Sequence, residues 1–296
     1  MTCTAKAAFG AALMLIVSAA SASAAAPGRN GDLAFVRNGD VYTVGPSAKK
    51  PPRLLVANAT LPAWSPDGSQ IAFVRDTGEI WRLDMATKVL KLVVADGTSP
   101  TWSPDSQEIA FERNQTTWIV DASGANAHQV GPTPGPLPPD GTDFAATSDE
   151  PDWSPDGATI AVTAFYGVPS SAIYGLSPDG SSFGYLAAPS DFNTEPEWAP
   201  TGGRLAITTF CCHHAGKVIF ADGAQMTPDV VFVPDAGPQW VTSSSPSWSP
   251  DGRSVAFQSD LEAIGQGYDI FIHDLATGAD RELVDDGTQP DWRPLR

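Results

Sequence analysis

Two groups of side chains in this sequence carry ligand chemistry, and the first is an unbroken run of thiols and imidazoles. Cys211, Cys212, His213 and His214 are consecutive. Thiolate and imidazole together suit Zn²⁺ or Cu⁺, but zinc sites usually separate their ligands by two or more residues so that the side chains converge. The alternative is a vicinal disulfide between Cys211 and Cys212, which an oxidising compartment favours. Such a bond is strained, because adjacent Cα atoms lie nearer than disulfide geometry prefers.

The second group is a set of carboxylates that stand just before tryptophans. They occur in Glu150-Pro-Asp152 and Glu195-Pro-Glu197, and Asp291 precedes another tryptophan in the same way. Carboxylates gathered at one point suit Ca²⁺, which takes several oxygen ligands, whereas solvated acids at strand ends are the alternative. We predict that any bound cation is Ca²⁺ and that its ligands are Glu150, Asp152, Glu195 and Glu197 rather than the Cys-His run.

Motifs for catalysis are absent from the sequence. It contains no Gly-x-Ser-x-Gly, no His-Glu-x-x-His and no glycine loop of the kind that cradles phosphate. The segment Ser47-Ala-Lys-Lys50 fits Ser-x-x-Lys but lacks the companion motifs of that enzyme class. We therefore assign no catalytic residue and no certain cofactor, and the sequence favours a protein that is not an enzyme.

The elements that position these residues repeat along the chain. Six tryptophans are spaced 38, 51, 45, 50 and 44 residues apart. The first five precede a turn segment such as Ser-Pro-Asp-Gly, and the sixth precedes only a remnant of it, Arg-Pro. A period of this length, with short β-type runs in every unit, is typical of a propeller of four-stranded blades. The tryptophans are Trp64, Trp102, Trp153, Trp198, Trp248 and Trp292.

One unit shows the four strands, and the two chain ends supply one more blade between them. In the unit 61–97, strands A to D are expected at 61–65, 70–74, 79–83 and 89–93, with the Pro-Asp-Gly reversal between A and B. The run 32–36 is a strand B without a strand A, and 289–294 is a strand A without a successor. Pairing these two ends closes an all-β, six-bladed ring, which removes exposed sheet edges.

One face of the ring is predicted to carry the partner site. In a propeller the A–B and C–D hairpins share one face, and the B–C and D–A connections share the other. On that second face the loops 165–171, 210–216 and 259–267 and the connections 131–148 and 234–244 are long and irregular, either because they bind or because loops there tolerate drift. We predict partner contacts through Phe165, Tyr166, Phe210, Trp240, Asp260 and Glu262.

The N-terminus and the net charge predict the location of the protein. A single lysine, the apolar run 7–17 and small residues at Ala22 and Ala24 predict a secretory signal peptide over 1–24, too short in its apolar part to span a bilayer, and a propeller domain over 25–296. Cleavage changes the net charge from −17 to −18, because it removes one lysine and no acid. So acidic a chain is not expected to bind nucleic acid or a membrane surface.

The repeat resembles that of TolB-type propellers. Pro62 to Phe73 and Pro246 to Phe257 follow Pro-x-Trp-Ser-Pro-Asp-Gly-x-x-Ile/Val-Ala-Phe, and a later strand and Asp-x-x-Thr-Gly hairpin follow at 269–278. The resemblance covers the expected propeller, but too few residues precede the first strand for the α/β domain that TolB carries. We predict an exported, monomeric, non-catalytic binding or scaffold module of the cell envelope, located in the periplasm or the extracellular medium, with envelope or extracellular proteins as partners. The alternative is a propeller lyase or hydrolase with a cation at the channel mouth.

Overall fold

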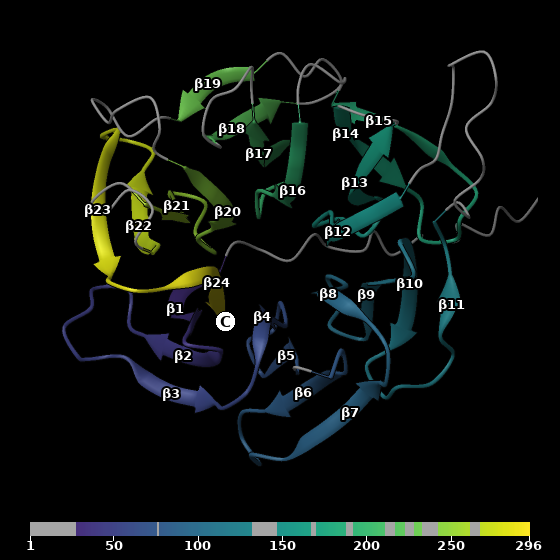
Figure 1. The fold of residues 1–296 in the computed structure, drawn as a ribbon, viewed down its shortest axis with the longest axis horizontal. Helices are drawn as coiled ribbons and strands as arrows, with labels where there is room; N and C mark the ends of the chain where they lie inside the picture. Colours follow the sequence, from purple (N-terminus) through teal and green to yellow (C-terminus); the bar gives the residue numbers. More distant parts are fainter. Residues whose placement is uncertain are drawn as a thin grey trace, which may run out of the picture.

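Six four-stranded blades form a closed ring around a central channel (Figure 1). A single parallel pairing of Ser171 with Phe192 joins the sheets of the fourth and fifth blades into one. The computed structural model describes residues 28–75, 77–131, 147–166, 170–187, 192–210, 217–222, 228–232, 242–260 and 267–296. No helix occurs in these ranges, and every blade runs from an innermost strand A to an outermost strand D. The predicted all-β, six-bladed propeller is confirmed.

The blades follow one another along the chain. Blade 1 contains β24 (Thr288–Leu295), β1 (Arg29–Arg37), β2 (Asp40–Val44) and β3 (Arg53–Val56). Blade 2 contains β4 (Thr60–Trp64), β5 (Gln70–Val74), β6 (Ile80–Asp84) and β7 (Leu90–Val94). Blade 3 contains β8 (Thr98–Trp102), β9 (Glu108–Arg113), β10 (Thr116–Asp121) and β11 (His128–Gln129).

The second half of the ring has the same strand order. Blade 4 contains β12 (Thr147–Trp153), β13 (Ile160–Tyr166), β14 (Ser170–Leu176) and β15 (Phe183–Ala187). Blade 5 contains β16 (Phe192–Trp198), β17 (Arg204–Phe210), β18 (Lys217–Asp222) and β19 (Pro228–Phe232). Blade 6 contains β20 (Ser243–Trp248), β21 (Ser254–Ser259), β22 (Asp269–Asp274) and β23 (Ala279–Val284).

The Ser-Pro-Asp turn is held by its own side chains. In blade 2 the Ser65 hydroxyl donates to Asp67 Oδ1 (2.6 Å) and accepts the Gln70 N–H (3.0 Å), while Asp67 Oδ1 also accepts the Ser69 N–H (2.9 Å). Gly68 has φ 68°, the left-handed conformation that glycine adopts without strain. These bonds explain why serine, aspartate and glycine recur at this turn.

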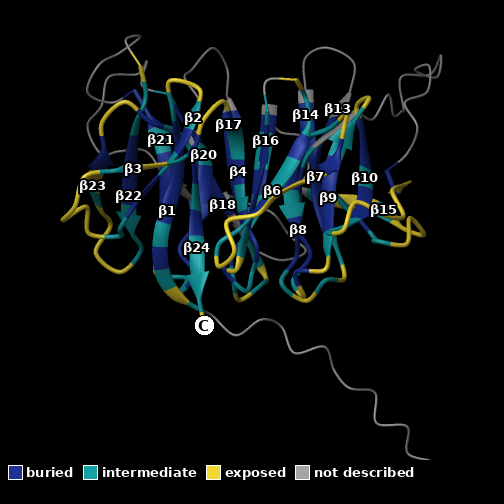
Figure 2. Cartoon of the chain, turned by 90° about the horizontal axis from the view of Figure 1, so that it is seen from below, coloured by how far each residue is buried: buried dark blue, intermediate teal, exposed yellow. Residues whose placement is uncertain are grey.

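The core lies between neighbouring blades rather than within one sheet. A single buried cluster joins Ala34 and Val41 of blade 1 to Trp64, Ile71 and Phe73 of blade 2. The strand-B alanine leaves room for a large side chain of the adjacent blade, so both faces of each sheet are covered. Figure 2 accordingly shows buried residues running through the body of the ring.

The last strand closes the ring, as the sequence predicts. β24 pairs antiparallel with β1, with Trp292 opposite Leu33 and Asp291 opposite Ala34. Arg293 then reaches blade 2, where its Nε donates to the Gly68 carbonyl (2.9 Å) and its guanidinium lies 4.8 Å from the centre of the Trp64 ring. One terminal strand therefore completes blade 1 and contacts blade 2.

The predicted signal peptide, residues 1–24, lies outside the described residues. In the part of the chain that is described, no helix has the length and apolar character needed to cross a membrane.

Candidate functional site: the central channel

All six inner strands have the same irregularity where they face the channel. Each carries a proline two residues before its tryptophan, and the pairing with strand B is shifted at that point. The residue before this proline has a positive φ of 48–53° in every blade, a conformation that strains residues other than glycine. These six residues are Leu61, Ser99, Glu150, Glu195, Ser245 and Gln289.

The irregularity divides the channel into a mouth, a waist and a turn side. The mouth cavity, about 220 Å³, is lined by the six positive-φ residues and the prolines that follow them. The cavity on the turn side, about 200 Å³, is lined by the tryptophans and the prolines of the A–B turns. Five of the six residues just before the tryptophans, among them Asp152, Glu197 and Asp291, line both cavities and form the waist.

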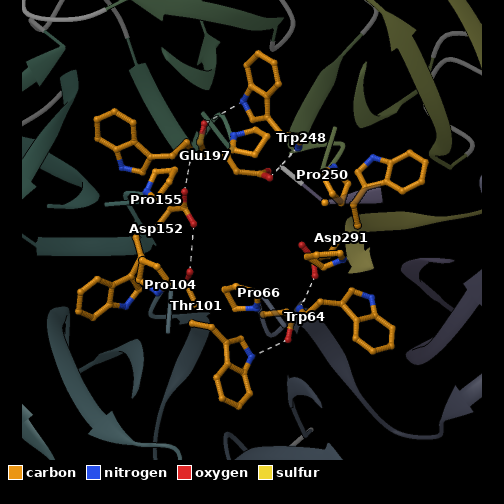
Figure 3. Close-up of a pocket in the computed structure, with 18 residues that line it drawn as sticks. Trp64, Pro66, Thr101, Pro104, Asp152, Pro155, Glu197, Trp248, Pro250 and Asp291 are labelled. Atoms are coloured by element: carbon orange, nitrogen blue, oxygen red, sulfur yellow. Dashed lines mark hydrogen bonds between the residues drawn. The ribbon is translucent and has the colours of Figure 1, made fainter. Parts of the chain in front are cut away.

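At the waist, three carboxyl groups each accept a hydrogen bond from the next blade (Figure 3). Asp152 Oδ2 accepts the backbone N–H of Trp198 (2.7 Å). In the same way Glu197 Oε1 accepts the backbone N–H of Trp248 (2.8 Å), and Asp291 Oδ2 accepts the backbone N–H of Trp64 (2.6 Å). We call these three contacts the waist latches, because each ties two blades together.

The other three interfaces have contacts at the same position. The Ser247 hydroxyl accepts the Trp292 N–H (3.3 Å). The Thr101 hydroxyl donates to Asp152 Oδ1 (3.1 Å), and the Ala63 carbonyl accepts the indole N–H of Trp102 (2.9 Å). The residue before each tryptophan therefore links its blade to the next one around the whole ring.

A second tier of contacts surrounds the mouth. Glu150 Oε2 accepts the Glu195 N–H (2.8 Å), and Glu195 Oε2 accepts the Ser245 N–H (2.7 Å). Between blades 1 and 2, Gln289 Oε1 accepts the backbone N–H of Leu61 (2.9 Å). The acids at the mouth are thus clustered in blades 4 and 5, and they are fixed by the neighbouring backbone.

The waist carboxyls bind protons more tightly than ordinary acids. They are partly exposed, but only into a channel that protein surrounds. Burial raises the pKa of Asp152 to about 7, against the hydrogen bonds from Trp198 and Thr101. Burial, with the charge of Asp152, raises the pKa of Asp291 to about 8. Burial and the charges of Asp152 and Asp291 likewise raise the pKa of Glu197 well above its usual range.

The four predicted calcium ligands occupy two tiers. Glu150 and Glu195 line the mouth, whereas Asp152 and Glu197 lie deeper, at the waist with Asp291. Each of the four carboxyl groups accepts a hydrogen bond from the adjacent blade. Within the described ranges, no three His, Cys, Asp or Glu side chains converge as metal ligands do. The calcium site therefore stays a prediction.

The residues predicted to contact a partner are only partly placed. Phe165 and Tyr166 end β13 and Phe210 ends β17. Asp260 is buried, and its Oδ1 accepts the Thr242 N–H (2.7 Å), so it fixes the strand end that leads into blade 6. Cys211, Cys212, His213, His214, Trp240 and Glu262 lie outside the described residues.

The sequence reading missed the latches. It placed the acids near the channel but treated them as free ligands or solvated groups. Aligning the copies on their tryptophans shows the signal, because the preceding position is Thr101, Asp152, Glu197, Ser247 or Asp291 in five of six blades. Polar side chains repeated at one position of a buried strand need partners, and the next blade offers its N–H groups.

The sequence matches no protein-family model and no curated protein. Solved structures do match. TolB from Acinetobacter baumannii is 20% identical with a TM-score of 0.71 over 89% of this chain and 67% of that one. A putative TolB from Agrobacterium tumefaciens is 16% identical with a TM-score of 0.66 over 88% and 91%. The chain has the TolB-type propeller fold.

An enzyme shares the architecture at a greater distance. An oligogalacturonate lyase solved in complex with manganese is 15% identical, with a TM-score of 0.52 over 87% of this chain and 74% of that one. At such identities the likeness shows the fold alone, because propellers of one shape serve several functions.

Proposed function

We propose that this protein is an exported, non-catalytic binding module that receives a partner protein of the cell envelope or extracellular medium at the mouth of its channel. The observation that supports this most is the construction of the mouth. Six Xaa-Pro pairs on inner strands give a rigid opening, and Glu150 and Glu195 place carboxylates in one sector of it. Rigid openings with a few fixed polar groups are the usual form of a binding site.

The hydrogen bonds of the acids agree with a structural and binding role. Glu150 and Glu195 accept backbone N–H groups, so their positions are set before any partner arrives. The TolB proteins among the structural neighbours have the same propeller, which supports an exported location of the kind that the signal peptide predicts. A partner with basic side chains would complement the acidic sector.

Affinity capture from envelope extracts tests the proposal. Glu150→Gln/Glu195→Gln keeps the N–H acceptors but removes both charges, and we expect it to lose the captured partner. Asp105→Asn/Asp156→Asn removes two charges from A–B turns on the opposite face and serves as the matched control. Equal loss in both variants, or loss only in the control, would place the binding site away from the mouth.

A propeller lyase or hydrolase with a cation at the channel is the second candidate. The oligogalacturonate lyase solved with manganese shares the propeller, and the waist carboxyls here retain oxygen atoms that face the channel. Metal analysis of the mature protein purified without chelators separates the two functions. A stoichiometric metal would favour the enzyme, and its absence would favour the binding module.

A further inference from the structure

Three arginines occupy the same place at the end of strand B in blades 1, 2 and 3. Arg37 ends β1, Arg75 directly follows β5, and Arg113 ends β9, where each strand leads into its B–C loop on the face of the channel mouth. Each guanidinium lies over two aromatic rings of its own blade, with 4.7–6.0 Å between the guanidinium carbon and the ring centres. Stacking of this kind favours one orientation of the group, so the three blades present it in a similar way.

Arg37 and Arg113 are tied to the preceding blade by aspartates. Arg37 Nε donates to the Asp286 carbonyl (2.8 Å), and its Nη2 donates to Asp285 Oδ1 (3.2 Å). Arg113 makes the same contacts with a single residue, since its Nε donates to the Asp96 carbonyl (2.9 Å) and its Nη2 to Asp96 Oδ1 (2.7 Å). At both interfaces a carboxylate of the incoming D–A connection therefore balances the charge of the arginine.

Blade 2 lacks this acid. At the two corresponding positions its incoming connection has Ala57 and Asn58, neither of which carries a charge. The correspondence rests on the strand-A tryptophan, which follows Asn58, Asp96 and Asp286 by the same six residues. No described residue forms an ion pair with Arg75, and its Nε is buried without an acceptor. The repeat thus keeps the cation in blade 2 but not its partner.

Arg75 nevertheless stays partly buried on a fixed aromatic surface. Its guanidinium carbon lies 5.0 Å from the centre of the Trp81 ring, and the Trp81 indole N–H donates to Glu79 Oε2 (3.0 Å), which holds the ring in place. An arginine removed from water is ordinarily paired, because an unbalanced charge is costly to bury. The terminal nitrogens, unlike Nε, reach the surface. The guanidinium is therefore positioned for an acceptor that the described residues do not supply.

We propose that Arg75 is a binding site for a carboxylate of a partner protein, which takes the place that aspartates fill beside Arg37 and Arg113. The planar guanidinium offers two parallel N–H donors to the two carboxylate oxygens, a geometry that lysine cannot reproduce. The chemistry fits an aspartate or glutamate side chain and equally a C-terminal carboxylate. The face of Trp81 beside the guanidinium would contact the methylene groups of the same ligand.

The position of this site complements the acids of the mouth. Arg75 lies where blade 2 meets blade 1, and this interface is opposite that of blades 4 and 5, where Glu150 bonds to Glu195 (Figure 1). A partner that met the arginine on one side and the acids on the other would be held in one orientation, because opposite charges fix register. The arginine site is built without the mouth acids, so its test does not depend on the proposed function.

Nuclear magnetic resonance of the arginine side chains tests the proposal. The full-length mature protein, labelled with ¹⁵N, is titrated at constant ionic strength with acetyl-aspartate amide, a side-chain carboxylate, and with acetylglycine, a terminal one. We expect a saturable shift of the Arg75 Nε–H signal, identified by its loss in Arg75→Lys, and no shift of the Arg113 signal. The probe that binds more tightly identifies the kind of carboxylate.

Two variants form a matched pair. Asn58→Asp supplies the missing acid and should raise the dissociation constant of the probe at Arg75 by about tenfold or more, because the internal carboxylate competes for the guanidinium. Asp96→Asn removes the acid beside Arg113 and should make that signal respond to the probes as Arg75 does. Both changes convert one side chain to its near-isostere, so the fold is retained.

Four results would overturn the inference. The first is no shift of Arg75 with either carboxylate, or an equal shift of Arg113 in the wild type. The second is unchanged binding in Asn58→Asp. The third is a response that appears only in Asp76→Asn, which would mean that this neighbour, outside the described residues, already fills the site. The fourth is a response to inorganic phosphate without a response to the carboxylates, which would assign the site to a different anion.

Discussion

At the scale of single residues, the waist acids combine two properties that are seldom found together. Asp152, Glu197 and Asp291 each accept a backbone N–H of the next blade. Burial nevertheless raises the pKa of all three, and the charge of Asp152 raises the pKa of Glu197 and Asp291 further. A neutral carboxyl still accepts a hydrogen bond through its carbonyl oxygen. The latch contacts are therefore compatible with protonated acids, and ionisation opposes the fold rather than supporting it.

We predict that the stability of the ring falls as pH rises from about 4 to about 8. An unfolded Asp291 ionises near its ordinary value of 3.8, but the folded group keeps its proton to about 8. Folding therefore takes up protons across this window, and the free energy of unfolding decreases with pH. Asp291→Asn keeps an acceptor for Trp64 but cannot ionise, so urea unfolding at pH 9 should show it more stable than the wild type, by on the order of a few kcal/mol.

Measurements at pH 5 supply the control for this prediction. There only the unfolded wild-type acid is ionised, and only by about one pH unit past its ordinary pKa of 3.8, so the advantage of Asp291→Asn should shrink to about 1–2 kcal/mol. Asp291→Ala, which leaves the Trp64 N–H without its acceptor, should be less stable than Asp291→Asn at both pH values, by about 1–3 kcal/mol. A variant Asp291→Asn with the pH dependence of the wild type would contradict the assigned proton uptake.

The predicted calcium site also belongs to this scale. If Glu150, Asp152, Glu195 and Glu197 bind Ca²⁺, millimolar Ca²⁺ should raise the melting temperature by mass action, and Glu150→Gln/Glu195→Gln should abolish the shift. Thermal melts with Ca²⁺ and with Zn²⁺ check this. A Zn²⁺-specific shift that disappears only in Cys211→Ser/His213→Ala would assign the site to the Cys-His run instead.

At the scale of elements, the shifted pairing in each inner strand brings the acids into contact with the next blade. The proline after each positive-φ residue has no N–H to give to the ladder, so the bulge places it where no ladder bond is lost. The turn residues Ser-Pro-Asp-Gly then reverse the chain toward strand B. Bulge, tryptophan and turn together form one unit that recurs in blades 2 to 6, and the bulge and tryptophan recur without the turn in blade 1.

The strain at the bulge predicts an unusual response to glycine. Ser99 has φ 49°, so Ser99→Gly should relieve strain and leave the free energy of unfolding unchanged or raised by up to about 1 kcal/mol. Its neighbour Thr98 pairs with Glu112 in the regular ladder, and Thr98→Gly should lower stability by about 1 kcal/mol. Urea unfolding of both variants checks this, and an equal loss of stability at the two sites would contradict the strained bulge.

Much of this element-level architecture follows from the sequence, because each repeat carries its own local signals. The Trp-Ser-Pro-Asp-Gly turns and the strand-B alanines predict four strands per blade and the closure by residues 289–294. The latches do not follow, because Asp291 and Trp64 are 227 residues apart and meet only after the ring has closed.

At the scale of the whole molecule, closure concentrates several contacts on the last eight residues. β24 completes blade 1, Asp291 latches to Trp64, and Arg293 contacts Gly68. Loss of this strand would expose edges on β1 and at the adjoining blade interfaces. The ring then has open ends of the kind that promote aggregation.

Deletion of residues 289–296 should therefore lower the melting temperature markedly and broaden the transition. Removal of Arg296 alone, which lies beyond β24, should leave the melt nearly unchanged and serves as the control. Differential scanning calorimetry measures both. A truncated protein that melts cooperatively at the wild-type temperature would show that the ring does not depend on this closure.

The binding role of the channel mouth is tested most directly by site-specific photo-crosslinking in envelope extracts. Benzoylphenylalanine replaces Leu61, which lines the mouth cavity, or Gln107, which is exposed in an A–B turn on the opposite face. We expect a discrete protein adduct from position 61 and none from position 107. An adduct from position 107 with none from position 61 would contradict the assignment of the mouth as the partner site.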